Sequence, residues 1–269
     1  MIRKIHEEFI TNSLKIFRED LRILGVAIGG SYITNDMDEY SDVDLIIAID
    51  NKYFKDIIDD RFKIAAKLGT LLSSFTGEHI GELGLIICLY GPDLLQVDLK
   101  FITLDDLTCR VENPTILWER NNCISNTFKL SEAKFPLPDL QWIEDRFWIW
   151  IYYISRKIGR GEIFETIESI SFLRQTVIGP LLLMKNGKLP RGVRKLETDA
   201  VDNLPLLIET VPTYNSESCI KSLKIIIKIY LDLREYFLTD KFIKRTEAEK
   251  SSLEYLDNLI IKLKLSDKF

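Results

Sequence analysis

Two aspartates separated by one residue, Asp42 and Asp44, are the side chains of this chain best suited to bind a divalent metal ion. Both stand at the start of an apolar run that continues from residue 45 to residue 49. On a β-strand, residues i and i+2 project to the same face of the sheet. Adjacent carboxylates repel each other unless a cation lies between them, and hard oxygen ligands on a rigid strand suit Mg²⁺. The spacing therefore predicts a magnesium site.

A glycine-serine turn precedes the two aspartates. The apolar segment 23–28 ends at Gly29, Gly30 and Ser31. Glycines let a backbone approach a ligand closely, and a serine hydroxyl with neighbouring amides can hold a phosphate at the start of a helix. The pattern predicts strand, tight turn and strand, with a phosphate-binding turn facing the metal ligands. The alternative is a solvated turn followed by a half-buried strand whose aspartates cap the turn and face water.

A third carboxylate, Asp98, falls in the middle of a later strand. Apolar segment 85–90, a Gly-Pro-Asp turn at 91–93 and alternating segment 94–102 together predict a β-hairpin. Asp98 shares one face of the second arm with Lys100, and a carboxylate in mid-strand is costly to bury without a partner. If this strand lies beside the one that carries the aspartate pair, the three acids converge. The alternative is a nearly neutral ion pair between Asp98 and Lys100 on a solvated face.

Gly30-Ser31 followed by Asp42 and Asp44 resembles the signature of the polymerase-β-like nucleotidyltransferase superfamily. The resemblance implies that three carboxylates hold two Mg²⁺ ions and an NTP, and that a nucleotidyl group moves to an acceptor hydroxyl. Asp98 corresponds to the third carboxylate. Many members place an arginine and a glycine soon after the serine, whereas this chain has residues Tyr32 to Asn35 there. An additional triphosphate contact from this turn is therefore left open.

The resemblance also implies roles for the nucleotide-binding residues. Gly29, Gly30 and Ser31 would grip the β- and γ-phosphates, while the metal ligands Asp42, Asp44 and Asp98 neutralise the triphosphate. Lys100 and Arg174 are further candidate contacts to phosphate.

Segments on either side of the first two predicted strands have the apolar spacing of helices. Apolar residues three and four apart predict an amphipathic helix over residues 2–20 and a second over 56–74. His6 lies next to an apolar position of the first helix, and we interpret it as a surface or capping residue without a role. Between residues 103 and 139 periodicity fades, and no regular element is predicted.

Prolines at 114, 136 and 138 interrupt the chain, and the pattern beyond them is helical to the end. We therefore expect a nucleotidyltransferase catalytic domain over residues 1–135 and a helical C-terminal domain over residues 136–269. The predicted fold class is α+β: a small mixed β-sheet with helices, the nucleotidyltransferase fold, followed by an all-helical bundle.

The start of the helical half resembles that of the aminoglycoside 6-adenylyltransferases, which append a helical bundle to the same catalytic module. The similarity lies in Phe147-Trp148, Tyr153, Lys157 and segment 160–162. It implies shared architecture and general activity, nearest to antibiotic adenylyltransferases of the aminoglycoside or lincosamide type, without naming the substrate.

The general base that deprotonates the acceptor hydroxyl has three candidates. One is Asp98. The others are Glu144 and Asp145, near the start of the helix predicted over 140–158, because a glutamate of the helical domain takes this role in related antibiotic adenylyltransferases. The alternative is that Glu144 and Asp145 are ordinary first-turn acids that favour the positive end of the helix dipole.

Composition limits the partners. The net charge is −5 and no Lys/Arg-rich block occurs, which argues against an extended nucleic-acid groove and suits a cationic small molecule. Apolar runs fall short of 18 residues, so we expect no membrane span, and the four cysteines are scattered, which predicts free thiols. We expect a cytoplasmic protein, and a homodimer is one assembly that we consider.

These observations lead to one preferred function and two alternatives. The preferred function is an adenylyltransferase that uses Mg²⁺ and an NTP, expected to be ATP, to modify a hydroxyl of a small molecule such as an aminoglycoside-like antibiotic. The first alternative is an RNA 3′-end nucleotidyltransferase, which would need a basic track for phosphates. The second is a non-catalytic nucleotidyltransferase-like binding or toxin-antitoxin module.

Overall fold

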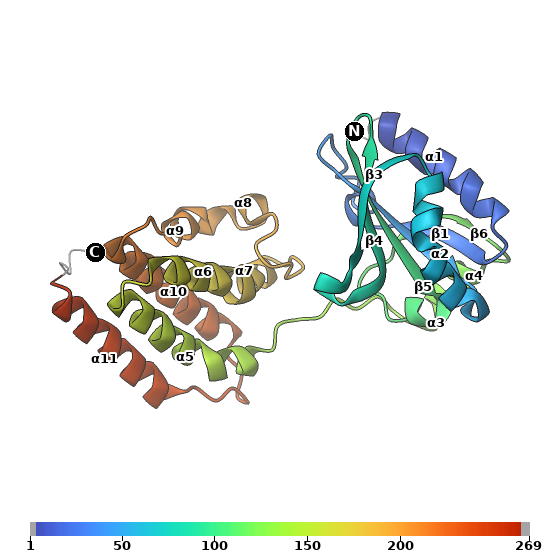
Figure 1. Ribbon diagram of the computed structural model, residues 1–269. Helices are drawn as coiled ribbons and strands as arrows, with labels where there is room; N and C mark the ends of the chain where they lie inside the picture. Colours follow the sequence, from blue (N-terminus) through green and yellow to red (C-terminus); the bar gives the residue numbers. More distant parts are fainter. Residues whose placement is uncertain (1–3, 265–269) are drawn as a thin grey trace. The chain divides into compact units, whose positions relative to one another are not determined.

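The computed structural model describes residues 4–264. The chain divides into two compact units, residues 1–136 and 137–269, and the expected boundary lies one residue from this division. In Figure 1 the N-terminal unit runs from blue to green, and the C-terminal unit from yellow-green to red.

The N-terminal unit is built on a six-stranded sheet with strand order β3-β4-β5-β2-β1-β6. Neighbouring strands pair antiparallel, except β2 and β5, which pair parallel. The strands are β1 (Ile23–Ile28), β2 (Val43–Ile49), β3 (Thr70–Gly77), β4 (Glu82–Gly91), β5 (Leu95–Thr103) and β6 (Thr115–Glu119).

Helices cover both faces of the sheet. Helices α1 (Lys4–Glu19) and α2 (Phe54–Lys67) bury Val43, Leu45 and Ile47 of β2 on one face. Helices α3 (Leu104–Leu107) and α4 (Cys123–Leu130) pack with Ile46 and Ala48 on the other. Because side chains alternate along a strand, Asp42 and Asp44 belong to this second face. Short 3₁₀ turns complete the unit: η1 (Gly30–Tyr32), η2 (Asn51–Tyr53) and η3 (Glu78–Ile80).

The segment after α2 differs from the sequence expectation. The helix expected over 56–74 ends at Lys67, and from Thr70 the chain forms β3, which pairs with β4 at the edge of the sheet. Leu68 and Leu72 continue the helical spacing, which explains the wrong prediction. Gly69, a poor helix former, follows the last turn, and pairing with β4 then satisfies the backbone.

Three short elements, α3, β6 and α4, lie where no regular structure was expected. Strand β6 pairs with β1, and α4 packs its buried Ile124 against the sheet. Short elements show little periodicity, so β6 is defined by its pairing with β1, and the helices are defined by packing of Leu107 and Ile124 against the sheet.

The C-terminal unit is all-helical, which confirms the expected fold class. Its elements are α5 (Leu140–Gly159), α6 (Ile163–Leu173), the π-helical turn η4 (Arg174–Ile178), α7 (Gly179–Lys185), α8 (Leu196–Asp199), η5 (Val201–Asn203), α9 (Leu204–Glu209), α10 (Ser216–Phe237) and α11 (Thr246–Lys262). The Asp139 side chain caps α5 by accepting from the N–H groups of Gln141 and Trp142. Helix α5 packs against α6, α10 and α11, and it buries Phe147, Trp148 and Ile151 in the core of the unit.

One helical stretch of the described chain, 163–185, is long and apolar enough to cross a membrane by length and composition alone. From the sequence we expected no membrane span. Half of that stretch is buried inside the unit, as in the core helix of a bundle, where apolar side chains face other helices rather than lipid.

Candidate active site

The parallel pairing of β2 with β5 brings together carboxylates that are far apart in the sequence. Its register places Asp44 directly opposite Asp98, with Val43 opposite Val97 and Leu45 opposite Leu99. Directly paired residues of neighbouring strands project to the same face. The expectation that the strand carrying Asp98 lies beside β2 is therefore confirmed.

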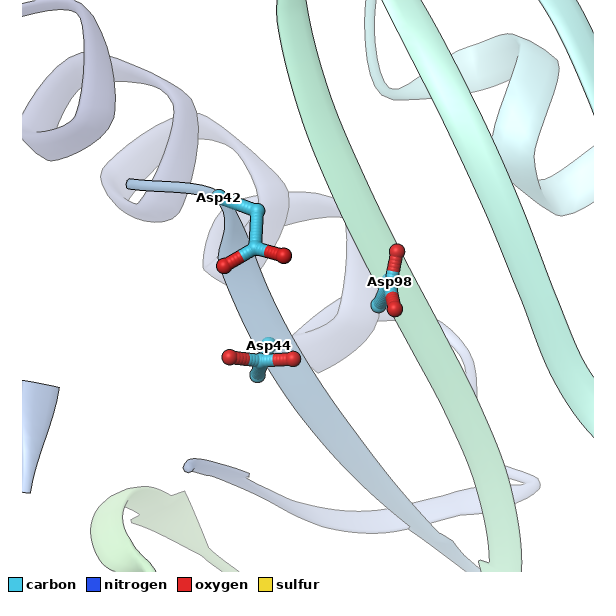
Figure 2. Close-up of side chains that lie close together, drawn as sticks. All are labelled: Asp42, Asp44 and Asp98. Atoms are coloured by element: carbon cyan, nitrogen blue, oxygen red, sulfur yellow. The ribbon is translucent and has the colours of Figure 1, made fainter. Parts of the chain in front are cut away.

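Asp42, Asp44 and Asp98 form a triad, and each contributes a carboxylate oxygen that lies within 4.8 Å of the other two. Figure 2 shows Asp42 just before β2, Asp44 on β2 and Asp98 on the neighbouring strand β5, with their carboxylates gathered at the same place. All three side chains are half-buried. Three hard anionic oxygens at this separation fit a divalent cation such as Mg²⁺, because a cation would offset a repulsion that water screens poorly at a half-buried position.

Electrostatics at the triad favour an added cation. Burial raises the pKa of the Asp98 carboxyl, and the charge of Asp42 acts in the same direction. Gln96 opposes the shift, because its side-chain amide donates to Asp98 Oδ1 at 3.2 Å. A carboxylate with neighbours of its own charge is one that a metal ion stabilises.

The glycine turn lies directly against the second aspartate. The Gly29 N–H donates to the carbonyl oxygen of Asp44 at 2.9 Å. Gly30 has φ +61°, a left-handed conformation that favours glycine, and a Cβ at this position would overlap Asp44 Oδ2. Only glycine therefore allows the turn to lie so close to the carboxylate. The expected phosphate-binding turn and the candidate metal ligands are thus adjacent in the structure.

His6, to which the sequence analysis gave no role, is a buried residue beside the triad. Only 2% of its surface is exposed, and Nε2 lies 2.9 Å from the carbonyl oxygen of Ser41, the residue before Asp42. Since a carbonyl oxygen only accepts, the ring nitrogen donates. His6 therefore holds the backbone at the start of β2, and the interpretation of a surface residue is wrong. The helical spacing of α1 alone does not reveal this contact.

A cavity of about 690 Å³ opens beside Asp42. Three acids, Glu39, Asp42 and Asp93, contribute to its lining, which also includes Lys4, His6 and Tyr40. The walls come from α1, from the loop before β2 and from the turn between β4 and β5. A cavity of this composition attracts a cationic group more than an anionic one.

Lys100 does not pair with Asp98. Its Nζ lies 3.0 Å from Glu82 Oε2 on the neighbouring strand β4, so the alternative of an Asp98–Lys100 ion pair is wrong. Strand pairing places Leu85 rather than Glu82 opposite Lys100, and the long lysine side chain reaches across to the start of β4. The role of Lys100 at a phosphate stays a prediction.

Glu144 and Asp145 lie in the helical unit, and each has partners there. Glu144 is fully buried: it accepts from the Tyr230 hydroxyl, and its Oε1 accepts from the Arg245 N–H at 2.8 Å and from Arg234 at 3.3 Å. Asp145 accepts from Gln141 at 2.8 Å and from Arg245 Nε at 2.7 Å, which hold its pKa below the usual range. These contacts tie α5 to α10 and to the start of α11. A general-base role for either acid stays a prediction.

Arg174 also lies in the helical unit. It begins the π-helical turn, and its guanidinium donates to the carbonyl oxygen of Thr210. Burial lowers its pKa. Its contact with a nucleotide stays a prediction.

Comparison with known families identifies the N-terminal unit. Residues 10–81 match the family described as nucleotidyltransferase domain. The matched segment contains the Gly29–Ser31 turn, Asp42 and Asp44, and Asp98 follows it on the paired strand. The N-terminal unit therefore contains a nucleotidyltransferase domain, and the expected place in the polymerase-β-like superfamily and the expected enzyme class are confirmed. None of the curated proteins matches the sequence.

Similar solved structures include an aminoglycoside 6-adenyltransferase from Bacillus subtilis, with 17% identity, TM-score 0.39 and coverage of 96% of this chain and 99% of that chain. A nucleotidyltransferase-like protein from Exiguobacterium sibiricum 255-15 has 12% identity, TM-score 0.39 and coverage of 97% and 92%. The STING-associated CdnE c-di-GMP synthase from Capnocytophaga granulosa has 14% identity, TM-score 0.32 and coverage of 86% and 81%.

Proposed function

We propose that the protein transfers AMP from ATP to a hydroxyl group of a small cationic molecule, with two Mg²⁺ ions held by Asp42, Asp44 and Asp98. The observation that carries the proposal is the convergence of these three carboxylates beside the Gly29–Gly30 turn. An NTP needs its triphosphate bound and its charge neutralised at the same place, and a glycine turn next to three carboxylates that could hold cations suits both needs.

The residues act in the following way. The Gly30–Ser31 turn binds the β- and γ-phosphates with its backbone amides and the serine hydroxyl. Asp42 and Asp44 would hold the cations that neutralise and orient the triphosphate, and Asp98 would complete the metal site. Bound Mg²⁺ ions would neutralise the charge that develops on the leaving pyrophosphate. Asp98 is the preferred base, and Glu144 and Asp145 remain the alternatives from the helical unit.

The acceptor class follows from the cavity beside Asp42. Glu39 and Asp93 supply negative charge within it, and Tyr40 supplies an aromatic face. A polyhydroxylated amine, such as an aminoglycoside-like antibiotic, offers both cationic groups and hydroxyl acceptors. Antibiotic resistance would follow from modification of such a molecule.

The two alternatives have weaker support. An RNA 3′ end would meet the acids of this cavity rather than a basic track. A non-catalytic module would have no need of three half-buried carboxylates within metal-binding distance, which cost free energy unless a cation is bound. The proposed location is the cytoplasm, which agrees with four free thiols.

The test is a transfer assay with purified full-length protein, Mg²⁺ and each α-labelled NTP. The acceptor panel contains aminoglycosides, lincosamides and simple amino sugars, with neutral sugars of similar size as matched controls. We expect label from ATP on a cationic acceptor and release of pyrophosphate. Absence of label with every NTP and acceptor, or equal transfer by the Asp44→Asn variant, would overturn the proposal.

A further inference from the structure

Glu112 reaches the glycine turn from a distant part of the chain. It lies between α3 and β6, and its Oε1 accepts a hydrogen bond from the Gly30 N–H at 3.2 Å. A Cβ placed on Gly29 would lie 3.3 Å from the same oxygen. A carboxylate therefore rests on both glycines of the turn. The sequence analysis did not single out this residue, because nothing in its local pattern points to the turn.

The loop that carries Glu112 is firmly attached. Arg110 donates to Asn113 Oδ1 at 2.7 Å within the loop, and it donates to Ser131 Oγ at 2.8 Å and to the Ser131 carbonyl oxygen at 2.7 Å beyond α4. The position of Glu112 is thus built into the fold.

The carboxylate uses the donor that a phosphate would need. A backbone N–H makes one strong hydrogen bond, so Glu112 and a phosphate oxygen compete for the amide of Gly30. Both acceptors are anions, and like charges at contact repel strongly where water is partly excluded. The Asp44 carboxylate also lies against this glycine, which adds to the negative potential that an incoming triphosphate meets.

We propose that Glu112 occupies the phosphate position of the turn in the nucleotide-free protein, and that a nucleotide must displace it in order to bind. Glu112 is then a residue that sets nucleotide affinity and disfavours triphosphate that arrives without its cation. The inference rests on the proposed function, because it takes the turn as the triphosphate site. Competition between Glu112 and phosphate for the Gly30 amide is not required by the reaction itself.

The Glu112→Gln substitution separates charge from hydrogen bonding. The glutamine carbonyl oxygen still accepts from Gly30, so the turn keeps its support, but the charge that opposes phosphate is lost. Glu112→Ala removes both. Asp59→Asn on α2 is the matched control, since it also removes one negative charge, and Asp59 is exposed on a helix that covers the opposite face of the sheet.

The experiment measures binding of α,β-methylene-ATP, inorganic tripolyphosphate and adenosine to the full chain by calorimetry, with Mg²⁺ present. We expect Glu112→Gln to bind both phosphate probes on the order of tenfold more tightly than wild type, about 1.4 kcal/mol. Adenosine affinity should stay unchanged, and Asp59→Asn should match wild type for every probe. Melting temperatures of the variants confirm that each is folded.

The outcomes distinguish the two proposals. If wild type binds the analogue but Glu112→Gln binds phosphate probes no more tightly, the competition is wrong while the proposed function stands. If Glu112→Gln binds them more weakly, Glu112 assists the nucleotide or its metal instead, which also overturns the inference. If neither wild type nor any variant binds the analogue or tripolyphosphate, the proposed function fails and the inference fails with it.

Discussion

Asp44 and Asp98 are direct partners in the parallel pairing of β2 and β5, so their carboxylates project to the same face of the sheet. Asp42 joins them at the start of β2, and each of the three has a carboxylate oxygen within 4.8 Å of the other two. The candidate metal site is therefore a consequence of one strand pairing, and its parts can be tested separately.

Substitution of either paired acid should abolish transfer without unfolding the protein. Asp44→Asn and Asp98→Asn each remove a metal ligand, and we expect kcat/KM to fall at least about a hundredfold, because several kcal/mol of charge stabilisation is lost. Without metal the variants should melt no lower than wild type, since one repulsion is relieved. Mg²⁺ should raise the melting temperature of wild type only. An Mg²⁺-dependent increase in either variant would contradict the assignment.

Gly30→Ala should lose nucleotide binding as well as stability. The substitution adds strain at φ +61°, about 1–2 kcal/mol, and its Cβ overlaps the Asp44 carboxylate. Gly81 is the matched control, because it also has a positive φ, 77°, but no atom lies within 4 Å of an added Cβ. Gly81→Ala should show the loss of stability alone, measured by denaturant unfolding, with transfer unchanged. Equal activity of the two variants would argue against the role of the turn.

His6→Ala should weaken metal binding through the backbone that carries Asp42. The histidine holds the carbonyl oxygen of Ser41, and loss of a residue that orients a metal ligand typically costs about 10–100-fold in affinity. His6→Gln should recover part of the affinity, since its amide can donate to the same oxygen. Titration of Mg²⁺ or Mn²⁺ measures the effect. A purely structural role would lower the melting temperature of both variants and leave their metal affinity equal to that of wild type.

Glu144 and Asp145 can be separated by comparing stability with activity. Removal of one partner from a buried ion pair costs about 3–5 kcal/mol, so Glu144→Ala should destabilise the helical unit by this amount. Asp145→Asn should have little effect on stability because that carboxylate is partly exposed. Denaturant unfolding of both variants checks the difference. A stable Glu144→Gln protein with a large loss of kcat would support the general-base role instead.

Acid should remove the contribution to folding stability of the ion pair between Asp20 and Arg22, which lies just before β1. Arg22 contacts Asp20 at 2.7 Å and Asp60 at 3.0 Å, and hydrogen bonding from Arg22 is the main cause that lowers the pKa of Asp20. Because the pKa of Asp20 is lower in the folded protein than in the unfolded chain, its ionised carboxylate stabilises the fold at every pH above the unfolded-state pKa. This stabilisation is lost as pH falls through the folded-state pKa. Asp20→Asn should therefore cost up to about 1 kcal/mol at neutral pH. The difference from wild type should shrink in unfolding experiments as pH falls below the ordinary aspartate pKa of about 3.9, and it should vanish once pH is below the folded-state pKa of Asp20.

Elements marked by a pattern that repeats every few residues along the chain could be predicted from the sequence. Alternation marked the face shared by Asp98 and Lys100, the glycines marked the turn, and the period of three to four marked α1 and α5. The prediction failed where the local pattern was compatible with both a helix and a strand. At Leu72 the spacing of apolar residues is helical, but the segment pairs with β4 as strand β3. No prediction was made for α3, β6 and α4, which are too short to show a period.

The sequence by itself determined which residue types stand at the turn and on the strands, since backbone conformation and side-chain alternation depend on near neighbours. Only the tertiary structure decided that β5 lies parallel to β2, that His6 is buried against Ser41, and that Glu112 rests on Gly30. These contacts join segments whose spacing along the chain has no period. They arise because hydrogen-bond pairing and burial of apolar surface are satisfied over the whole domain at once.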